Sequence, residues 1–308
     1  MESMNFDKVY EAWKAEKAVF VKESSMATYL LLAEKHLLPV FREATEITED
    51  DAQSLIITLT DRGLSEKTAR DVMVVLRMII RYADKRDWWV ARPWRLKYPS
   101  DHSRPNLSVL SPNDQKKLMD YLASNYSLRN LGILICLNTG MRIGEICGLQ
   151  WDDIDLHERI VYVSRTVSRI YNPEMKGHRR SVIVVGPPKT ESSYREIPIS
   201  SPLVSMLSMP KSNSLGSNFV LSNKAKPIEP RTYRSYFEQV LGEVGLSHIN
   251  FHGLRHTFAT RCIESQCDVK TVSSILGHAD VSTTLNVYVH PNLEHKRRCI
   301  DKMVQSLL

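Results

Sequence analysis

The sequence has no hydrophobic run long enough to cross a membrane. Its uninterrupted apolar stretches, such as Ile133 to Leu137, hold six residues or fewer, whereas a membrane helix needs ~20. The first residues, MESMNFDKVYEAWK, carry charges where a secretory signal peptide would carry an apolar segment. We therefore expect no membrane partner, and we expect a cytoplasmic, nucleoid-associated protein.

Cysteine is scarce, and its number is odd. The five cysteines, at positions 136, 147, 262, 267 and 299, cannot all pair with one another. A complete disulfide framework is therefore excluded, and reduced thiols are expected. We interpret Cys262 and Cys267 as buried thiols that are too widely spaced for a redox pair. Internal repeats and low-complexity tracts are also absent, as in an ordinary globular chain.

The positive charge of the chain is unevenly distributed. The formal net charge is +6, yet residues 1–105 hold 17 basic and 17 acidic residues, so the whole excess follows residue 105. Basic side chains neutralise phosphates, which makes a nucleic-acid partner compatible with this distribution. Many proteins carry a similar charge for solubility alone.

Two domains are expected from the length of 308 residues. The first, residues 1–105, shows helical periodicity, with Phe6, Val9, Tyr10 and Trp13 on one face of its first helix. From about residue 91 to residue 112, four prolines disfavour helix and predict a linker.

The second domain, residues 106–308, has a mixed pattern. Helical patterns cover about 112–138 and 143–149 and return after residue 230. Residues 160–166, 182–185 and 195–199 are typical of short antiparallel strands, and 167–180 is expected to be an exposed basic loop.

Five segments of the second domain carry chemically useful side chains. Arg142 is expected at a helix N-terminus after Gly140, Lys189 in a turn ahead of a strand, and His278 after a glycine turn. His252 and Arg255 are three residues apart and share a helix face. The segments are TGMRIGEICGLQWDDIDL (139–156), PKTESSYREIPI (188–199), FHGLRHTFAT (251–260), LGHADVST (276–283) and TLNVYVH, which contains Tyr288.

The order Arg, Lys, His-x-x-Arg, Gly-His, Tyr resembles the catalytic domain of the tyrosine recombinases, also called the phage integrase family. The resemblance is specific over about 139–290 and only general over 1–105. It implies an all-α, SAM-like core-binding bundle followed by a mainly helical, α+β catalytic domain with a small antiparallel sheet. It also implies Tyr288 as nucleophile, Arg142 and Arg255 as the arginine pair, and His252, His278 and Lys189 as the remaining catalytic residues.

The proposed reaction explains why these residue types are needed. Breaking a phosphodiester by transesterification adds negative charge to the non-bridging oxygens, which two guanidinium groups can bind bidentately. Tyrosine must be activated at its ordinary pKa of about 10. Lysine can supply a proton to the leaving oxygen, and histidine can exchange one near neutral pH. The 3′-phosphotyrosine conserves the bond energy, so the resemblance implies no cofactor, neither ATP nor metal.

Several readings compete with individual assignments. Lys176 lies in the same expected hairpin as Lys189. Glu145 is expected to support the site rather than transfer protons, and a structural role is favoured for His256. The His252 and His256 pair has the spacing of a zinc helix but lacks its glutamate and a third ligand.

We therefore expect a site-specific recombinase that integrates or excises a mobile element. The expected partners are duplex DNA and further copies of the chain, as a homo-tetramer on synapsed DNA, with accessory directionality or DNA-bending factors possible. The chain is expected to lack an arm-binding domain. An Xer-like resolvase or a DNA invertase is the alternative. Rivals of other classes are a non-cutting DNA-binding protein, a type IB topoisomerase and a metalloenzyme. The segment after Tyr288 is expected to form an amphipathic tail helix that docks on its own or a neighbouring subunit.

Overall fold

The computed structural model describes residues 4–99, 108–172, 181–188, 190–288, 297, 300–301 and 303–305. The chain forms two compact units. Unit 1 contains Met1–Pro105 together with Arg169–Val182, and unit 2 contains Asn106–Ser168 and Ile183–Leu308. None of the helices within the described ranges combines the length and the apolarity that a membrane span requires.

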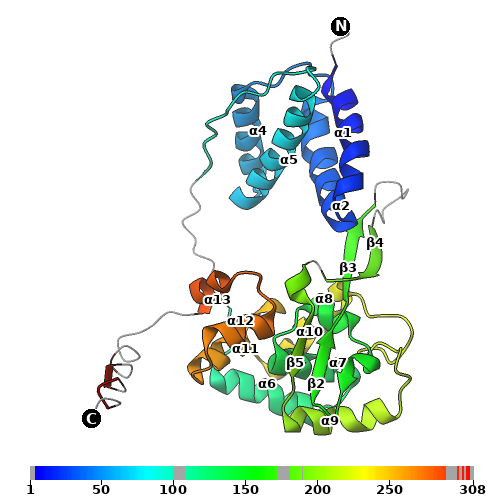
Figure 1. Ribbon diagram of the computed structural model, residues 1–308, viewed down its shortest axis with the longest axis vertical. Helices are drawn as coiled ribbons and strands as arrows, with labels where there is room; N and C mark the ends of the chain where they lie inside the picture. Colours follow the sequence, from blue (N-terminus) through cyan, green and yellow to red (C-terminus); the bar gives the residue numbers. More distant parts are fainter. Residues whose placement is uncertain are drawn as a thin grey trace. The chain divides into compact units, whose positions relative to one another are not determined.

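The described part of unit 1 is built mainly from helices (Figure 1). They are α1 (Phe6–Phe20), α2 (Glu23–Leu32), a π-helical turn (Ala33–Leu37), α3 (Leu38–Phe41), α4 (Glu49–Asp61) and α5 (Glu66–Asp84). The predicted face of α1 is buried, since Phe6, Val9, Tyr10 and Trp13 are each at most 2% exposed. Helix α5 packs against α1, α2 and α4, so its wide apolar face forms the centre of this core.

The N-termini of these helices follow the capping residues in the sequence. Thr48 accepts a hydrogen bond from the Asp51 backbone, and the Asp51 carboxylate accepts one from the Thr48 backbone, which forms a capping box at α4. Ser65 caps α5 in the same manner, with its hydroxyl accepting from the Thr68 backbone. After α5, the described residues 91–99 contain neither helix nor strand.

Unit 2 is mostly helical with small sheets (Figure 1). Its helices are α6 (Pro112–Ser124), α7 (Leu128–Thr139), α8 (Ile143–Gly148), α9 (Ser201–Ser212), α10 (Pro230–Val244), α11 (His252–Glu264), α12 (Val269–Leu276) and α13 (Val281–Tyr288), with single 3₁₀ turns at Trp151–Asp153 and Glu191–Ser193. Helix α11 packs against α7 and α12, and α13 packs against α11 and α12. This arrangement places the N-terminus of α8, which follows α7, close to the end of α12.

Three strands of unit 2 form one antiparallel sheet. They are β1 (Ile154–Asp155), β2 (Ile160–Val163) and β5 (Arg195–Pro198). Strand β2 lies in the middle, with Val161 opposite Ile154 on one side and Ile197 on the other. The buried faces of these strands join the main core of unit 2.

The expected basic loop over 167–180 is wrong in its first part. Strand β3 (Thr166–Tyr171) occupies it and pairs with β4 (Ser181–Gly186). The segment TVSRIY buries Val167 and Ile170, which are three residues apart and therefore lie on opposite faces of the strand. Its β-branched residues Thr166, Val167 and Ile170 favour extended backbone, and the pairing with β4 continues the strand through the polar residues between them. The outer part of β3 belongs to unit 1, where the Tyr171 hydroxyl donates to Glu34 at 2.5 Å.

Candidate active site

A glycine turn positions Arg142. Helix α7 ends at Gly140, whose φ of 64° is a left-handed conformation. A Cβ at Gly140 would lie 2.6 Å from Phe258 Cδ1, so both the backbone and the close packing require glycine. The chain then places Arg142 in extended backbone directly ahead of α8. The predicted position of Arg142 at a helix N-terminus is thus observed.

Glu145 connects Arg142 to a second arginine. The Glu145 carboxylate accepts from the Arg142 backbone at 2.8 Å and from its Nη1 at 2.9 Å. It also accepts from Arg195 Nη1 at 3.1 Å and Nη2 at 2.8 Å. Arg195 further donates to the carbonyl oxygens of Ile275 and Ser193. With side-chain exposures of 5% for Arg195 and 3% for Glu145, this is a buried, fully hydrogen-bonded ion pair.

The ionisation of Glu145 follows from these contacts. Burial alone would raise the pKa of the carboxyl group. Hydrogen bonds and charge from Arg195, and then from Arg142, outweigh burial and hold the pKa below its ordinary value. Glu145 is therefore a carboxylate at neutral pH, suited to orienting arginines and not to donating protons.

Helix α11 carries His252 and Arg255 in its first turn. Arg255 is 1% exposed, and its guanidinium donates to Gly140 O at 2.8 Å and to Leu276 O at 2.7 Å. The arginine thus joins the ends of α7 and α12. Its burial means that a positive charge is fixed inside the unit by carbonyl dipoles.

The turn after α12 presents His278. Gly277 has a φ of 66°, and a Cβ there would lie 2.9 Å from Ser192 O. His278 follows directly, and its Nδ1 lies 2.8 Å from the hydroxyl oxygen of the buried Thr284. The predicted glycine turn ahead of His278 is therefore present, and Thr284 fixes the orientation of the ring.

Consecutive carbonyls of this turn bring the two arginines together. Arg142 Nη2 donates to Gly277 O at 3.3 Å, and Arg255 Nη2 donates to Leu276 O at 2.7 Å. These carbonyls immediately precede His278. Two guanidinium groups from distant sequence segments thus meet beside one imidazole.

The field of these arginines acts on both histidines. Desolvation by the surrounding protein, then His256, Arg255 and Arg142, lower the pKa of His252 to about 4, although the residue as a whole is exposed. Desolvation, then Arg255 and Arg142, lower the pKa of His278 to about 4 as well. Both rings are neutral at pH 7, so each can accept or donate a hydrogen bond. Clustered arginines beside neutral imidazoles suit an anionic group such as a phosphate.

Four of the six predicted site residues are brought together in this way: Arg142, Arg255, His252 and His278. Lys189 and its competitor Lys176 lie outside the described residues. Tyr288 ends α13, and its side chain lies outside the described part of the structure. Most of the expected tail helix after Tyr288 is likewise outside the described residues.

Arg195 is the residue that sequence analysis missed. It lies in the segment 188–199, where the sequence pattern predicts only the start of a strand. The signal that could have identified it is alternation, because Arg195 shares a strand face with the buried Ile197. An arginine on a buried face requires an anionic partner.

The second imidazole of α11 packs on the first. His256 meets His252 edge to face, with ring centroids 4.6 Å apart. Across the described ranges, no group of three His, Cys, Asp or Glu side chains is arranged to hold a metal ion.

Comparisons with known proteins identify the family. The pattern of the Phage integrase family matches residues 108–295. A tyrosine recombinase XerC-like protein of Caldanaerobacter subterraneus subsp. tengcongensis is 27% identical over 266 residues, which cover 80% of this chain and 68% of the relative. The transposase from transposon Tn916 of Enterococcus faecalis is 26% identical over 275 residues, 82% of this chain and 65% of the relative.

A solved structure has the same fold. The Tn1549 transposon integrase in complex with a circular intermediate DNA superposes with a TM-score of 0.77 at 22% identity, over 98% of this chain and 100% of that one. This chain belongs to the phage integrase family. It is a tyrosine recombinase, a member of a family of enzymes that cleave and rejoin DNA.

Proposed function

We propose that this recombinase breaks and rejoins duplex DNA through a 3′-phosphotyrosyl intermediate formed on Tyr288, in order to integrate or excise a mobile element. The observation that carries the catalytic assignment is the meeting of Arg142 and Arg255 at the turn before His278. A scissile phosphate beside these groups would have its non-bridging oxygens opposite two cations. Deleting one such charge-stabilising donor typically lowers the rate by ~10²–10³-fold.

The other roles follow from protonation. His252 and His278 are neutral in the DNA-free protein, so His278 can donate a hydrogen bond to the phosphate and His252 can assist proton transfer. Lys189 is the proposed general acid for the departing 5′ oxygen. The phosphotyrosine retains the energy of the broken bond, so the reaction as proposed uses neither ATP nor a metal.

The biological role rests on the relatives. The Tn916 transposase and the Tn1549 transposon integrase both belong to mobile elements, which supports integration or excision. The XerC-like relative favours a resolvase role instead. In either role, the family resemblance supports a tetramer that brings two DNA sites together.

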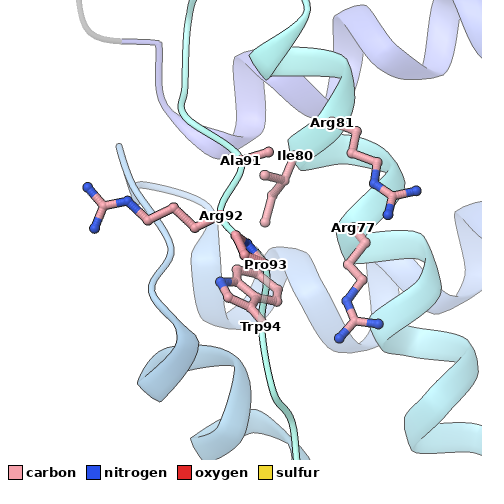
Figure 2. Close-up of a pocket in the computed structure, with 7 residues that line it drawn as sticks. All are labelled: Arg77, Ile80, Arg81, Ala91, Arg92, Pro93 and Trp94. Carbon is pink, nitrogen blue, oxygen red and sulfur yellow. The ribbon is translucent and has the colours of Figure 1, made fainter.

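Unit 1 supplies a second basic feature that supports DNA binding. A pocket of about 240 Å³ is lined by Arg77 and Arg81 of α5 and by Arg92 and Trp94 of the following segment (Figure 2). Among the described residues that line this pocket, none is acidic. Guanidinium groups in such a lining can bind phosphates. We assign 1–105 as an all-α core-binding domain, with the linker beginning near residue 91, and 106–308 as the catalytic domain.

The test requires no knowledge of the target site. Wild type and Tyr288→Phe are expressed in the same cells and purified under denaturing conditions, and any attached DNA is sequenced. Covalent DNA on wild type alone, concentrated at one junction, would support the nucleophile, the activity and the site together.

The other outcomes separate the rivals. Scattered adducts would indicate a topoisomerase. Adducts on both proteins would refute Tyr288 as the nucleophile. If neither protein carries adducts although both protect one DNA sequence from nuclease, the chain is a non-cutting DNA-binding protein. A junction between an element and its flank would favour integration, and one at a replicon dimer site would favour resolution.

A further inference from the structure

Helix α11 ends in a turn that brings two cysteines together. The Cys267 backbone N–H donates to Cys262 O at 3.0 Å, and the Gln266 N–H donates to Ile263 O at 3.0 Å. Gln266 has a φ of 64°. These three features define a Schellman motif, in which the residues occupied by Cys262 and Cys267 contact each other across the turn.

This geometry corrects the expectation that the two thiols are too far apart to pair. A 3.0 Å hydrogen bond between the two backbones holds the Cα atoms within about 7 Å of each other, the limit for a disulfide without backbone movement. Sequence separation was misleading because the left-handed residue reverses the chain. Moreover, Cys267 is exposed rather than buried.

The two thiols differ in their surroundings. Cys262 packs on the small apolar cluster of Ala259, Val272 and Leu276. Burial is the main cause that raises the pKa of Cys262 to about 11, and the charge of Cys267 and a hydrogen bond with it add to the effect. Cys267 is the solvent-accessible partner, whereas Cys136 and Cys147 are buried and have raised pKa values. Oxidants therefore reach the pair before they reach these core thiols.

We propose that Cys262 and Cys267 form an oxidant-sensitive dithiol that closes to an intramolecular disulfide when the protein meets a peroxide. The Cys267 thiol loses its proton, and the thiolate attacks one oxygen of hydrogen peroxide, whose O–O bond breaks. The hydroxide that leaves takes up the released proton, so a sulfenic acid and one water result. The sulfur of Cys262 then gives up its proton and attacks the sulfur of Cys267, and a second water leaves. Two thiols lose two electrons in total, and one peroxide gains them.

The position of the two cysteines determines which segments the disulfide would connect. Cys262 is on α11, whose first turn carries His252 and Arg255, and Cys267 lies in the link to α12, which leads to His278. The bond would tie the end of α11 to this link. None of the proposed DNA chemistry uses either thiol, so the dithiol is independent of that proposal.

The experiment counts thiols in the full-length, reduced chain. The protein is treated with a stoichiometric amount of hydrogen peroxide, denatured, alkylated with N-ethylmaleimide and examined by intact and peptide mass spectrometry. The wild type is expected to fall from five alkylated thiols to three, with a peptide bridge between Cys262 and Cys267 that dithiothreitol reverses.

Single substitutions make the result decisive. Cys299→Ser should lose the same two thiols and serves as the matched control. Cys267→Ser, at an exposed position, should lose none at this dose, and Cys262→Ser should give a Cys267 sulfenic acid that dimedone traps. A bridge from Cys267 to Cys299, or five remaining thiols in wild type at a dose that oxidises Cys262→Ser, would overturn the proposal.

A second measurement avoids oxidation altogether. Phenylarsine oxide binds tightly only where two thiols can reach one arsenic atom. One equivalent should bind wild type and Cys299→Ser but neither Cys262→Ser nor Cys267→Ser. Equal binding by Cys267→Ser would show that another pair of thiols is responsible and would refute the assignment.

Discussion

The Arg195 guanidinium donates to both carboxylate oxygens of Glu145, at 3.1 and 2.8 Å. Glu145 uses the same two oxygens to hold the backbone and side chain of Arg142. Arg195 therefore acts on Arg142 through Glu145. The Arg142 side chain is 36% exposed. Of the three linked residues, Arg142 is therefore the one that can reach a substrate, and Arg195 is a positioning residue.

Glu145→Gln tests this relationship. The variant leaves the buried Arg195 without a charged partner, and breaking a buried ion pair typically costs about 3–5 kcal/mol. We expect the free energy of unfolding to fall by that amount in urea titrations. DNA cleavage should fall at temperatures where the variant is still folded.

Two further variants distinguish a structural role from a role in DNA cleavage. Asp120→Asn removes an exposed ion pair with Lys116 in the same unit and should cost less than about 1 kcal/mol. Arg142→Lys should leave the unfolding midpoint nearly unchanged but lower the cleavage rate by ~10²-fold or more, because an ammonium cannot replace the guanidinium fork. Full activity of Arg142→Lys would remove Arg142 from the catalytic set.

Gly277→Ala tests the turn that supplies both a carbonyl for Arg142 and the position of His278. The alanine would combine a φ of 66° with a Cβ 2.9 Å from Ser192 O. We expect a loss of stability above the ~1–2 kcal/mol of left-handed strain, together with a marked loss of cleavage.

Gly245→Ala is the matched control. Gly245 also has a positive φ, at 71°, but a Cβ there meets no atom within 4 Å. It should cost only the left-handed strain and should leave cleavage intact. If both variants lose the same free energy of unfolding, close packing at Gly277 is unimportant.

Local rules made most of the helix boundaries predictable from the sequence. Ser111 followed by Pro112, Thr48 followed by acids, and the glycine turns at Gly140 and Gly277 have local causes that need no tertiary information. The order of the motifs along the chain also needs no tertiary information, and it indicated the family.

Non-local contacts could not be predicted in this way. The ion pair between Glu145 and Arg195 joins residues 50 positions apart. The hydrogen bond from Arg255 to the Leu276 carbonyl at the end of α12 depends on how two helices pack. Strand β3 was missed because its polar residues Ser168 and Arg169 resemble a loop, whereas its pairing with β4 supplies the backbone hydrogen bonds of a strand. The contact between Cys262 and Cys267 was missed because a glutamine, not a glycine, adopts the left-handed position.

The protonation of His252 and His278 leads to a prediction for pH. Both pKa values lie near 4 in the folded, DNA-free chain, below the ~6.5 of an unfolded histidine. As the pH falls from about 6.5 towards about 4, the unfolded chain takes up protons that the folded one does not, so stability decreases. NMR titration of the ring protons should give midpoints near 4, and those of the urea-unfolded chain near ~6.5. Folded-state midpoints at or above 6.5 would contradict the description of these rings as neutral.

Replacing the pocket arginines of unit 1 should change the salt dependence of DNA binding. If Arg77, Arg81 and Arg92 each bind one phosphate, each Arg→Gln variant should weaken binding to all sequences alike and reduce the slope of log K against log salt by about 1. The control is Arg70→Gln, since Arg70 pairs with Glu66 at 2.6 Å and stacks on Tyr98 at 4.0 Å. A guanidinium already held by a carboxylate and a ring should release no counterion, so this slope should stay at the wild-type value. If the slopes of all four variants equal the wild-type slope, the DNA contacts of unit 1 lie away from this pocket.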